Sequence, residues 1–358
     1  MWMEAIEKVI RRRGYFLRRR DLRVLGYSDH AIRASLGVRR IFRVRQGWYS
    51  VADAPEAAIR AVRVGGRLTA TSALETYGLR VPIRDELHVA VQATASRLRS
   101  STERRHRLVS TDRVRVHWVD RRQVGASSWR VPIEDALLAV LNEEPRDVAI
   151  ACASAVMRHK RWSSRKMDAV FARAPLQARA WRPLVSALDD SHGETFLRLW
   201  FLDAGMPFMQ QVQMAGIGRF DFKVGPHTFV EVDGGQHDPG WTGTATNSWE
   251  KGHDWDASMA IIGNVVLRYT YRQLYADLVR VLLSVERVVD NDVALTALRL
   301  KHPYVRRKRE PVIRSPFSRS TSPSHVRRKR RTFATKPFGT AQNERFGGAS
   351  PAFLAGEG

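Results

Sequence analysis

The sequence is poor in cysteine and in acidic residues, and it has no long hydrophobic run. Its single cysteine, Cys152, excludes an internal disulfide and an all-cysteine zinc site, and fits a reducing compartment. No run of about 18 apolar residues is present, so we expect no membrane-spanning helix. These absences favour a cytoplasmic protein with ordinary hydrophobic cores, since 44% of its residues are apolar.

The positive charge is concentrated at the two ends of the chain. Lys and Arg number 60 against 36 Asp and Glu, which gives a formal net charge of +24. Residues 1–50 hold 13 basic and 4 acidic residues, and residues 301–358 hold 14 and 3, so these ends carry +20 of the total. Such an excess favours nucleic acid as the partner, before an anionic membrane surface. We therefore expect a nucleoid-associated protein with no membrane attachment.

Residues 1–53 predict three short helices followed by a β-hairpin, with Ser28 as an N-cap. The expected elements cover residues 3–13, 20–25, 29–35, 41–44 and 48–51. This order is typical of a winged helix-turn-helix domain, whose third helix enters the major groove of DNA. A small helical domain with a solvated basic face is the alternative. The candidate DNA contacts are Arg33, Arg39, Arg40, Arg43 and Arg45.

Neither the middle of the chain, residues 54–186, nor its C-terminal end, residues 298–358, carries a catalytic pattern. Residues 54–186 predict an α+β region, which is either a connector or a module for binding a toxin or another protein partner. Residues 298–358 combine low apolar content with blocks of basic residues, which predicts a disordered basic tail. Such a tail adds sequence-independent affinity for DNA, and a merely solvated tail is the alternative.

Residues 187–297 predict an α/β domain with the element order α-β-β-β-α-β-α. Two of its apolar strands carry carboxylates: Asp221 lies in one, and Glu231 and Asp233 lie in the next. Acidic groups in a buried strand are costly unless they are paired or bind a metal. Hard oxygen ligands suit Mg²⁺ or Mn²⁺, which can polarise a phosphate and lower the pKa of a water. These three carboxylates are therefore the predicted metal ligands.

The two-residue period of a strand predicts how these side chains are arranged. It puts Phe220 and Phe222 on one face and Asp221 on the other, opposite the carboxylates of the next strand if the two form a hairpin. Glu194, at the start of the preceding helix, is a candidate to join them, and His237 is a candidate general base. The simpler alternatives are a favourable helix-dipole interaction for Glu194 and a surface-loop position for His237.

These residues form a pattern that resembles a known family. It consists of Glu194, Arg219-Phe220-Asp221-Phe222, Val230-Glu231-Val232-Asp233-Gly234, His237, Asp256 and Gly263-x-x-Val-Leu-Arg268. Over roughly residues 187–290 it resembles the very-short-patch-repair endonuclease branch of the PD-(D/E)XK nucleases. The resemblance implies a restriction-endonuclease-like fold for this domain.

The same resemblance assigns roles to the residues that match. It implies that Asp221 and Glu231 are metal ligands with support from Glu194, that His237 is the catalytic histidine, and that Asp256 is a late acidic partner. It also implies that Arg268 steadies the site or a DNA phosphate. Two departures matter. Asp233 stands where other nucleases of the superfamily carry the motif lysine, which this branch commonly lacks. The late segment reads His253-Asp254-Trp255-Asp256 where the branch usually has an arginine before that aspartate, so Asp254 is an alternative to Asp256.

A second resemblance covers the first 50 or so residues. The segments Tyr27-Ser28-x-x-Ala31-Ile32-Arg33 and Phe42-Arg43-Val44-Arg45-Gln46-Gly47-Trp48-Tyr49 are similar to the winged helix of AbiEi-type antitoxins. Together the two resemblances imply a Mg²⁺- or Mn²⁺-dependent endonuclease or nickase acting on double-stranded DNA. The alternatives are an AbiEi-type DNA-binding antitoxin or transcriptional regulator with an inactive nuclease-like domain, and cleavage of RNA. The oligomeric state stays open.

Overall fold

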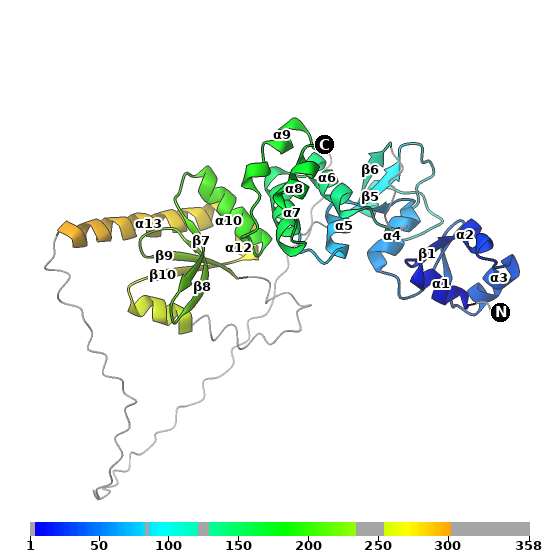
Figure 1. Ribbon diagram of the computed structural model, residues 1–358, viewed down its shortest axis with the longest axis horizontal. Helices are drawn as coiled ribbons and strands as arrows, with labels where there is room; N and C mark the ends of the chain where they lie inside the picture. The colour runs from blue at the N-terminus through cyan, green and yellow to red at the C-terminus, as the bar shows by residue number, and fades with distance from the viewer. Residues whose placement is uncertain (1–3, 83–85, 121–128, 234–253, 302–358) are drawn as a thin grey trace, which may run out of the picture. The chain divides into compact units, whose positions relative to one another are not determined.

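In the residues that the structure describes, three small sheets and the helices around them form a mixed α/β protein (Figure 1). This computed structural model describes residues 4–82, 86–120, 129–233 and 254–301, with the backbone alone for residues 233 and 294–301. The chain divides by contacts into residues 1–306 and 307–358, and every described residue belongs to the first unit. Within the described ranges, each helix is too short or too polar to cross a membrane.

The first sheet is antiparallel, with strand order β1-β3-β2, and three helices accompany it. The elements are α1 (Ile6–Arg12), β1 (Phe16–Arg18), α2 (Arg19–Val24), α3 (Asp29–Gly37), β2 (Phe42–Arg45) and β3 (Trp48–Ser50). Ser28 caps α3 as predicted, because its Oγ accepts a hydrogen bond from the Ala31 N–H at 3.1 Å. The predicted helices and hairpin are confirmed, and the short strand β1 is an addition.

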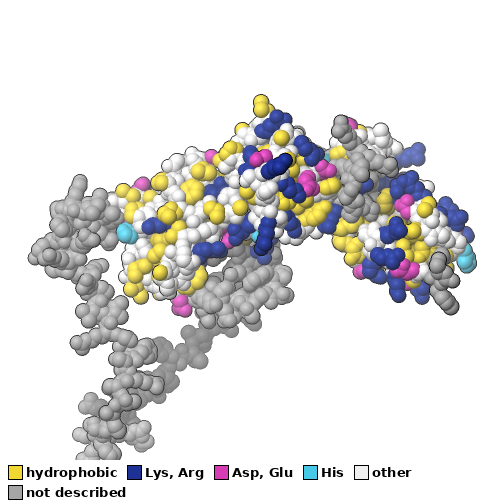
Figure 2. All heavy atoms as spheres, in the orientation of Figure 1, with side chains coloured by type: hydrophobic (Ala, Val, Ile, Leu, Met, Phe, Trp, Pro, Cys, Tyr) yellow, Lys and Arg dark blue, Asp and Glu magenta, His cyan; other side chains and the backbone are white. Residues whose placement is uncertain are grey.

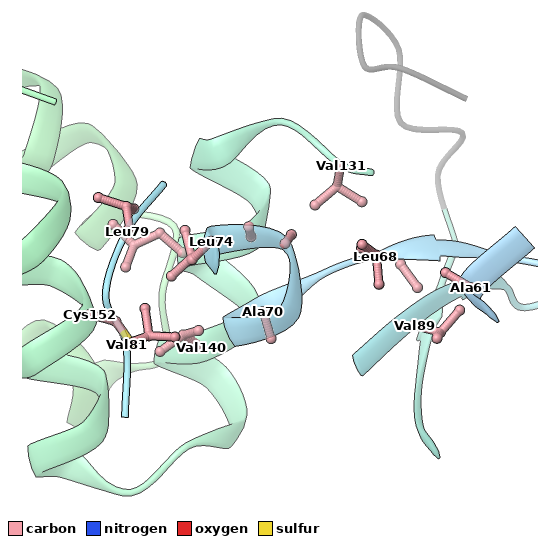
Figure 3. Close-up of a cluster of buried hydrophobic side chains, with 14 of the residues drawn as sticks. Ala61, Leu68, Ala70, Leu74, Leu79, Val81, Val89, Val131, Val140 and Cys152 are labelled. Carbon is pink, nitrogen blue, oxygen red and sulfur yellow. The ribbon is translucent and has the colours of Figure 1, made fainter. Parts of the chain in front are cut away.

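The second sheet, β4-β5-β6, pairs β5 with β6 in parallel and with β4 antiparallel. Its region contains α4 (Glu56–Val64), β4 (Arg67–Leu68), α5 (Ala70–Thr76), β5 (Leu87–Gln92), β6 (Val114–Val119), α6 (Ile133–Glu143), α7 (Arg146–His159), α8 (Ser164–Phe171) and α9 (Leu176–Arg179). Figure 3 shows part of its core, where Leu68, Leu74, Val140 and Cys152 are buried. The same core includes Phe16 from β1, so it continues across the predicted boundary at residue 53.

The third sheet has the order β10-β9-β8-β7, in which β10 and β9 are parallel and the other pairs antiparallel. Its elements are α10 (His192–Asp203), β7 (Met209–Met214), β8 (Gly218–Lys223), β9 (Thr228–Asp233), a helix over residues 254–261, β10 (Val265–Thr270), α12 (Tyr271–Ala276) and α13 (Leu278–Lys301). The predicted element order is confirmed, with the last helix divided in two. The last helix also runs past residue 297, into the range predicted to be tail, while the rest of that tail, from residue 302, lies outside the described residues.

Apolar side chains cover both faces of this third sheet. On one face, Leu197 and Phe201 of α10 pack with Phe222, Val230 and other residues of the strands. On the other face, Met259 packs with Phe220 and Phe229. The sheet is thus sandwiched between helices, and polar groups at the start of α10 lie close to the strand edge.

Candidate functional site

Glu194 is fixed at the first turn of α10 by two sets of hydrogen bonds. Ser191 is the N-cap, and its Oγ accepts from the Glu194 N–H at 3.1 Å. In return, Glu194 Oε2 accepts from the Asp190 N–H and from Gln211 Nε2, both at 3.0 Å. The side chain is therefore buried and held in one orientation by α10, the preceding loop and β7.

The carboxylates of Glu194 and Asp221 lie near enough to interact electrostatically. Burial, followed by repulsion from Asp221, raises the pKa of Glu194 from 4.5 to about 8. Asp221 Oδ2 in turn accepts a hydrogen bond from the Val232 N–H at 2.9 Å, so its carboxylate lies beside the backbone of β9. Two predicted site residues far apart in the sequence thus meet where α10, β8 and β9 come together.

The prediction that Phe220 and Phe222 lie on the same face of β8 is wrong. Phe220 packs with Phe229 and Met259 on one side of the sheet, whereas Phe222 packs with Val230 on the other. The paired residues of β7 and β8 step from Gln210↔Phe222 to Val212↔Phe220, and Gln211 between them has a left-handed φ of 53°. The register of the two strands is the same on both sides of Gln211, while Phe220 and Phe222, two residues apart on β8, pack on opposite faces of the sheet.

Glu231 and Asp256 are both bound by the same arginine. Arg268 lies beside Glu231 in the parallel β9–β10 pair, and its Nη1 approaches Glu231 Oε2 at 3.3 Å. Its Nε and Nη2 contact the Asp256 carboxylate at 3.0–3.1 Å. Arg268 thus bridges the two acidic side chains, and its role of steadying a catalytic site stays a prediction.

The remaining predicted members of the metal site cannot be placed by their side chains. Asp233 is the last residue of β9, and its side chain lies outside the described residues, as does all of His237. The convergence of Asp221, Glu231 and Asp233 therefore stays a prediction. Within the described side chains, no group of three or more His, Cys, Asp or Glu is arranged to hold a metal ion.

The described carboxylates nevertheless have the chemistry of a partial Mg²⁺ or Mn²⁺ site. Glu194 and Asp221 offer hard oxygen ligands, and they repel one another in a desolvated setting. A divalent cation between them would offset that repulsion. Its ligands would be Asp221 and Glu194, joined by whichever of Glu231, Asp233 and His237 reach it.

A buried ion pair supports this site and was not predicted from the sequence. Asp189 accepts two hydrogen bonds from Arg198, from Nε at 2.9 Å and from Nη2 at 2.7 Å, and both side chains are almost fully buried. Thr195 Oγ1 and Gln210 Nε2 donate to the same carboxylate at 2.9 Å. This network ties α10 to the preceding loop and to β7. The acidic residues before α10 indicated that such a pair forms here, but the sequence did not identify its partner, Arg198, which lies nine residues after Asp189.

The predicted DNA-contacting arginines lie in different settings. Four of them, Arg33, Arg39, Arg40 and Arg43, are exposed, and Arg40 also lies 3.9 Å from a Glu7 carboxylate oxygen. Arg45 differs, because its guanidinium packs against Gly65 at the end of α4, where burial lowers its pKa. Figure 2 shows the Lys and Arg side chains gathered over this N-terminal part. We therefore expect Arg45 to support the hairpin more than to contact DNA.

Comparison with known proteins adds no assignment. No protein-family model matches the chain, and no curated protein matches it significantly.

Proposed function

We propose that this protein is a metal-dependent endonuclease or nickase that hydrolyses phosphodiester bonds in DNA. The observation that carries the proposal is the electrostatic interaction between the buried Glu194 carboxyl and the half-buried Asp221 carboxylate, in a chain of net charge +24. A basic protein attracts a polyanion, and a close carboxylate pair is suited to a divalent cation. Both properties are needed to hold a metal ion against a DNA phosphate.

The residues around the site have separable tasks in this proposal. A bound Mg²⁺ or Mn²⁺ would polarise the scissile phosphate and lower the pKa of the attacking water. Asp221 would be kept in position by the Val232 N–H, and Glu194 by the Asp190 N–H and Gln211. With a pKa of about 8, Glu194 carries a proton at neutral pH, and the proton competes with the cation for its oxygens.

The N-terminal residues would position the duplex. The element order α1-β1-α2-α3-β2-β3 supports a winged helix-turn-helix, and the exposed Arg33 on α3 and Arg43 on β2 are suited to contacts with DNA. The predicted basic tail would add affinity for any sequence.

The proposal is tested by incubating the full-length protein with supercoiled plasmid, single-stranded DNA and RNA in Mg²⁺, in Mn²⁺ and in EDTA. We expect metal-dependent nicking or cutting of duplex DNA that Asp221→Asn abolishes. Asp290→Asn is the matched control, because Asp290 is an exposed carboxylate on α13, outside the predicted set of site residues. Cleavage that Asp221→Asn retains in full, or no cleavage of any substrate in either metal, would count against the proposal.

Two observations favour a second candidate, a DNA-binding antitoxin or transcriptional regulator of the AbiEi type with an inactive nuclease-like domain. Glu231 is ion-paired with Arg268 at 3.3 Å, and an aspartate stands at position 233 where a lysine is usual in related nucleases. In that case the protein would protect a specific DNA sequence in a footprint without cutting it, in every metal. Retained footprinting together with absent cleavage would select this second candidate.

A further inference from the structure

A pocket of about 470 Å³ lies between the β2–β3 hairpin and a loop of the following region. Strand β2 contributes Phe42 and Arg43, α4 contributes Arg63, and residues 102–105 close the pocket from the other side. Four arginines and one glutamate line it, which leaves a local net charge of +3. Its lining thus comes both from the predicted DNA-binding domain and from the region taken as a connector.

The loop that closes the pocket is internally hydrogen-bonded. Ser100 Oγ donates to Asp112 Oδ1 at 2.6 Å and accepts from the backbone N–H groups of Thr102 and Glu103 at 3.3 Å. The Ser100 N–H donates to the His106 carbonyl at 3.1 Å, and Arg99 and Arg107 form an isolated antiparallel bridge. The loop therefore presents its basic residues in a set geometry before any ligand binds, which lowers the entropic cost of binding.

Backbone carbonyls hold two of the arginines in the pocket. Arg63 Nη1 donates to the carbonyls of Ser101 and Thr102 at 2.8 and 2.9 Å. Arg104 Nη1 donates to the Arg43 carbonyl at 2.9 Å, which joins the loop directly to β2. A guanidinium has five N–H donors, so each arginine keeps further donors for an anion.

The electrostatics of the pocket also favour an anion. Partial burial is the largest cause that lowers the pKa of Arg63, and the positive charges of Arg104 and Arg60 lower it further. The negative charges of Glu56 and Glu103 act in the opposite direction. Partly desolvated cations that repel one another are stabilised by a negative group placed between them. Guanidinium groups match the geometry of phosphate oxygens.

We propose that this pocket binds a phosphate of the DNA backbone, so that residues 102–105 and Arg63 extend the DNA-binding surface beyond the β2–β3 hairpin. This inference rests on the DNA-binding part of the proposed function but is independent of cleavage. It gives the region after residue 54 a role in holding the substrate. An acidic segment of a protein partner is the competing occupant, and the test below separates the two.

The test measures binding of the full-length protein to a fluorescently labelled duplex of mixed sequence, in EDTA, over a range of salt concentrations. Arg104→Ala and Arg105→Ala each remove one exposed guanidinium from the pocket. Arg165→Ala is the matched control, because Arg165 is an exposed arginine on α8. Each pocket variant is expected to weaken binding about three- to tenfold and to reduce the slope of log affinity against log salt by about 1.

A variant that is expected to bind DNA more tightly controls for misfolding as the cause of weaker binding. Glu103 is exposed, and its Oε1 accepts from the Arg105 N–H at 3.2 Å, a bond that glutamine can also accept. Glu103→Gln removes the negative charge from the pocket and is expected to tighten duplex binding about two- to threefold, because it increases the local positive charge. A gain of affinity does not result from a damaged fold.

The outcomes are distinguishable from failure of the nuclease proposal. If Arg104→Ala, Arg105→Ala and Arg165→Ala bind the duplex alike at every salt concentration, the pocket does not bind DNA, as expected if an acidic protein segment occupies it. If wild-type protein binds no duplex at low salt, this inference and the proposed function both fail. If the pocket variants weaken binding and wild type cuts nothing, this inference stands and the nuclease proposal fails.

Discussion

The buried carboxyl of Glu194 interacts electrostatically with the carboxylate of Asp221, and burial followed by this repulsion raises the pKa of Glu194 to about 8. The relationship joins the first turn of α10 to the middle of β8, residues that are 27 positions apart in the sequence. Two interacting carboxylates, one of them buried, are costly in a folded protein unless a proton or a cation lies between them. The first two predictions below follow from whether a proton or a cation is present, and the next two concern the contacts that hold α10 in place.

The first prediction concerns stability against pH in EDTA. The folded-state pKa of Glu194 lies above its ordinary value of 4.5, so its contribution to stability is full below that value and is lost as pH rises through about 8. Glu194→Gln mimics the protonated acid at every pH. We expect equal melting temperatures for variant and wild type near pH 4.5, and a variant that is more stable above pH 8 by about 2–4 kcal/mol. A constant difference across this range would contradict the pairing of Glu194 with Asp221.

The second prediction concerns removal and addition of the metal. Saturating Mn²⁺ at about 100 times its dissociation constant is expected to stabilise the wild type by about 2.7 kcal/mol. The stabilisation should be larger at pH 8.5 than at pH 6, because Glu194 must lose its proton to bind the ion. Thermal melts of Asp221→Asn should show little of this effect, whereas Asp290→Asn should keep it. Equal stabilisation of both variants would indicate that the metal binds elsewhere.

The third prediction concerns Gly193, which allows α10 to approach the sheet. A Cβ at this position would lie 2.4 Å from Tyr271 Cε1 and 2.8 Å from Val232 Cγ1. Gly193→Ala should therefore push Glu194 away from Asp221 and cost about 1–3 kcal/mol of stability. Gly37→Ala is the control, since no described heavy atom lies within 4 Å of its added Cβ, and it should be neutral or slightly stabilising. Chemical denaturation measures both, and equal effects would contradict the close approach.

The fourth prediction separates a buried ion pair from an exposed one. Arg198→Ala leaves the buried Asp189 carboxylate without its bidentate partner and should cost about 3–5 kcal/mol. Arg146→Ala breaks the pair with Asp203, in which the Arg146 side chain is 33% exposed and the Asp203 side chain 50% exposed. This change should cost no more than about 1 kcal/mol. Urea unfolding of the two variants checks the difference. A loss below 1 kcal/mol for Arg198→Ala would mean that the network around Asp189 is not needed to hold α10.

The sequence was sufficient to predict most helices and strands, for local reasons. The period of apolar residues predicted α1, whose Ile6, Val9 and Ile10 are buried, and the side chain of Ser28 marked the start of α3. Strands β1 and β4, with three and two residues, are too short for any period to be visible. The division of the final helix at Asp277 also has no clear local signal.

The site was predicted in part, and its errors come from long-range geometry. Glu194 and Asp221 were both identified, and Arg268 was expected to steady the site, since these residues lie in a recognisable pattern. The facing of β8 was wrong because the strand changes face between Phe220 and Phe222, beside Gln211 of β7, whose backbone is left-handed. A glutamine seldom adopts that conformation, so nothing in the sequence near Asp221 announces it. The Asp189–Arg198 pair was missed because it forms only when the loop folds over α10.

The most direct test of the account is the single-turnover rate of plasmid nicking in Mg²⁺ by wild type and Asp221→Asn at equal, saturating protein. Changing even the partners of a metal ligand costs about 10–100-fold, so loss of a ligand should reduce the rate by more than about 100-fold. The account predicts that result, with Asp290→Asn at the wild-type rate. An Asp221→Asn variant that nicks plasmid within threefold of the wild-type rate, about the scatter expected between preparations, would contradict it.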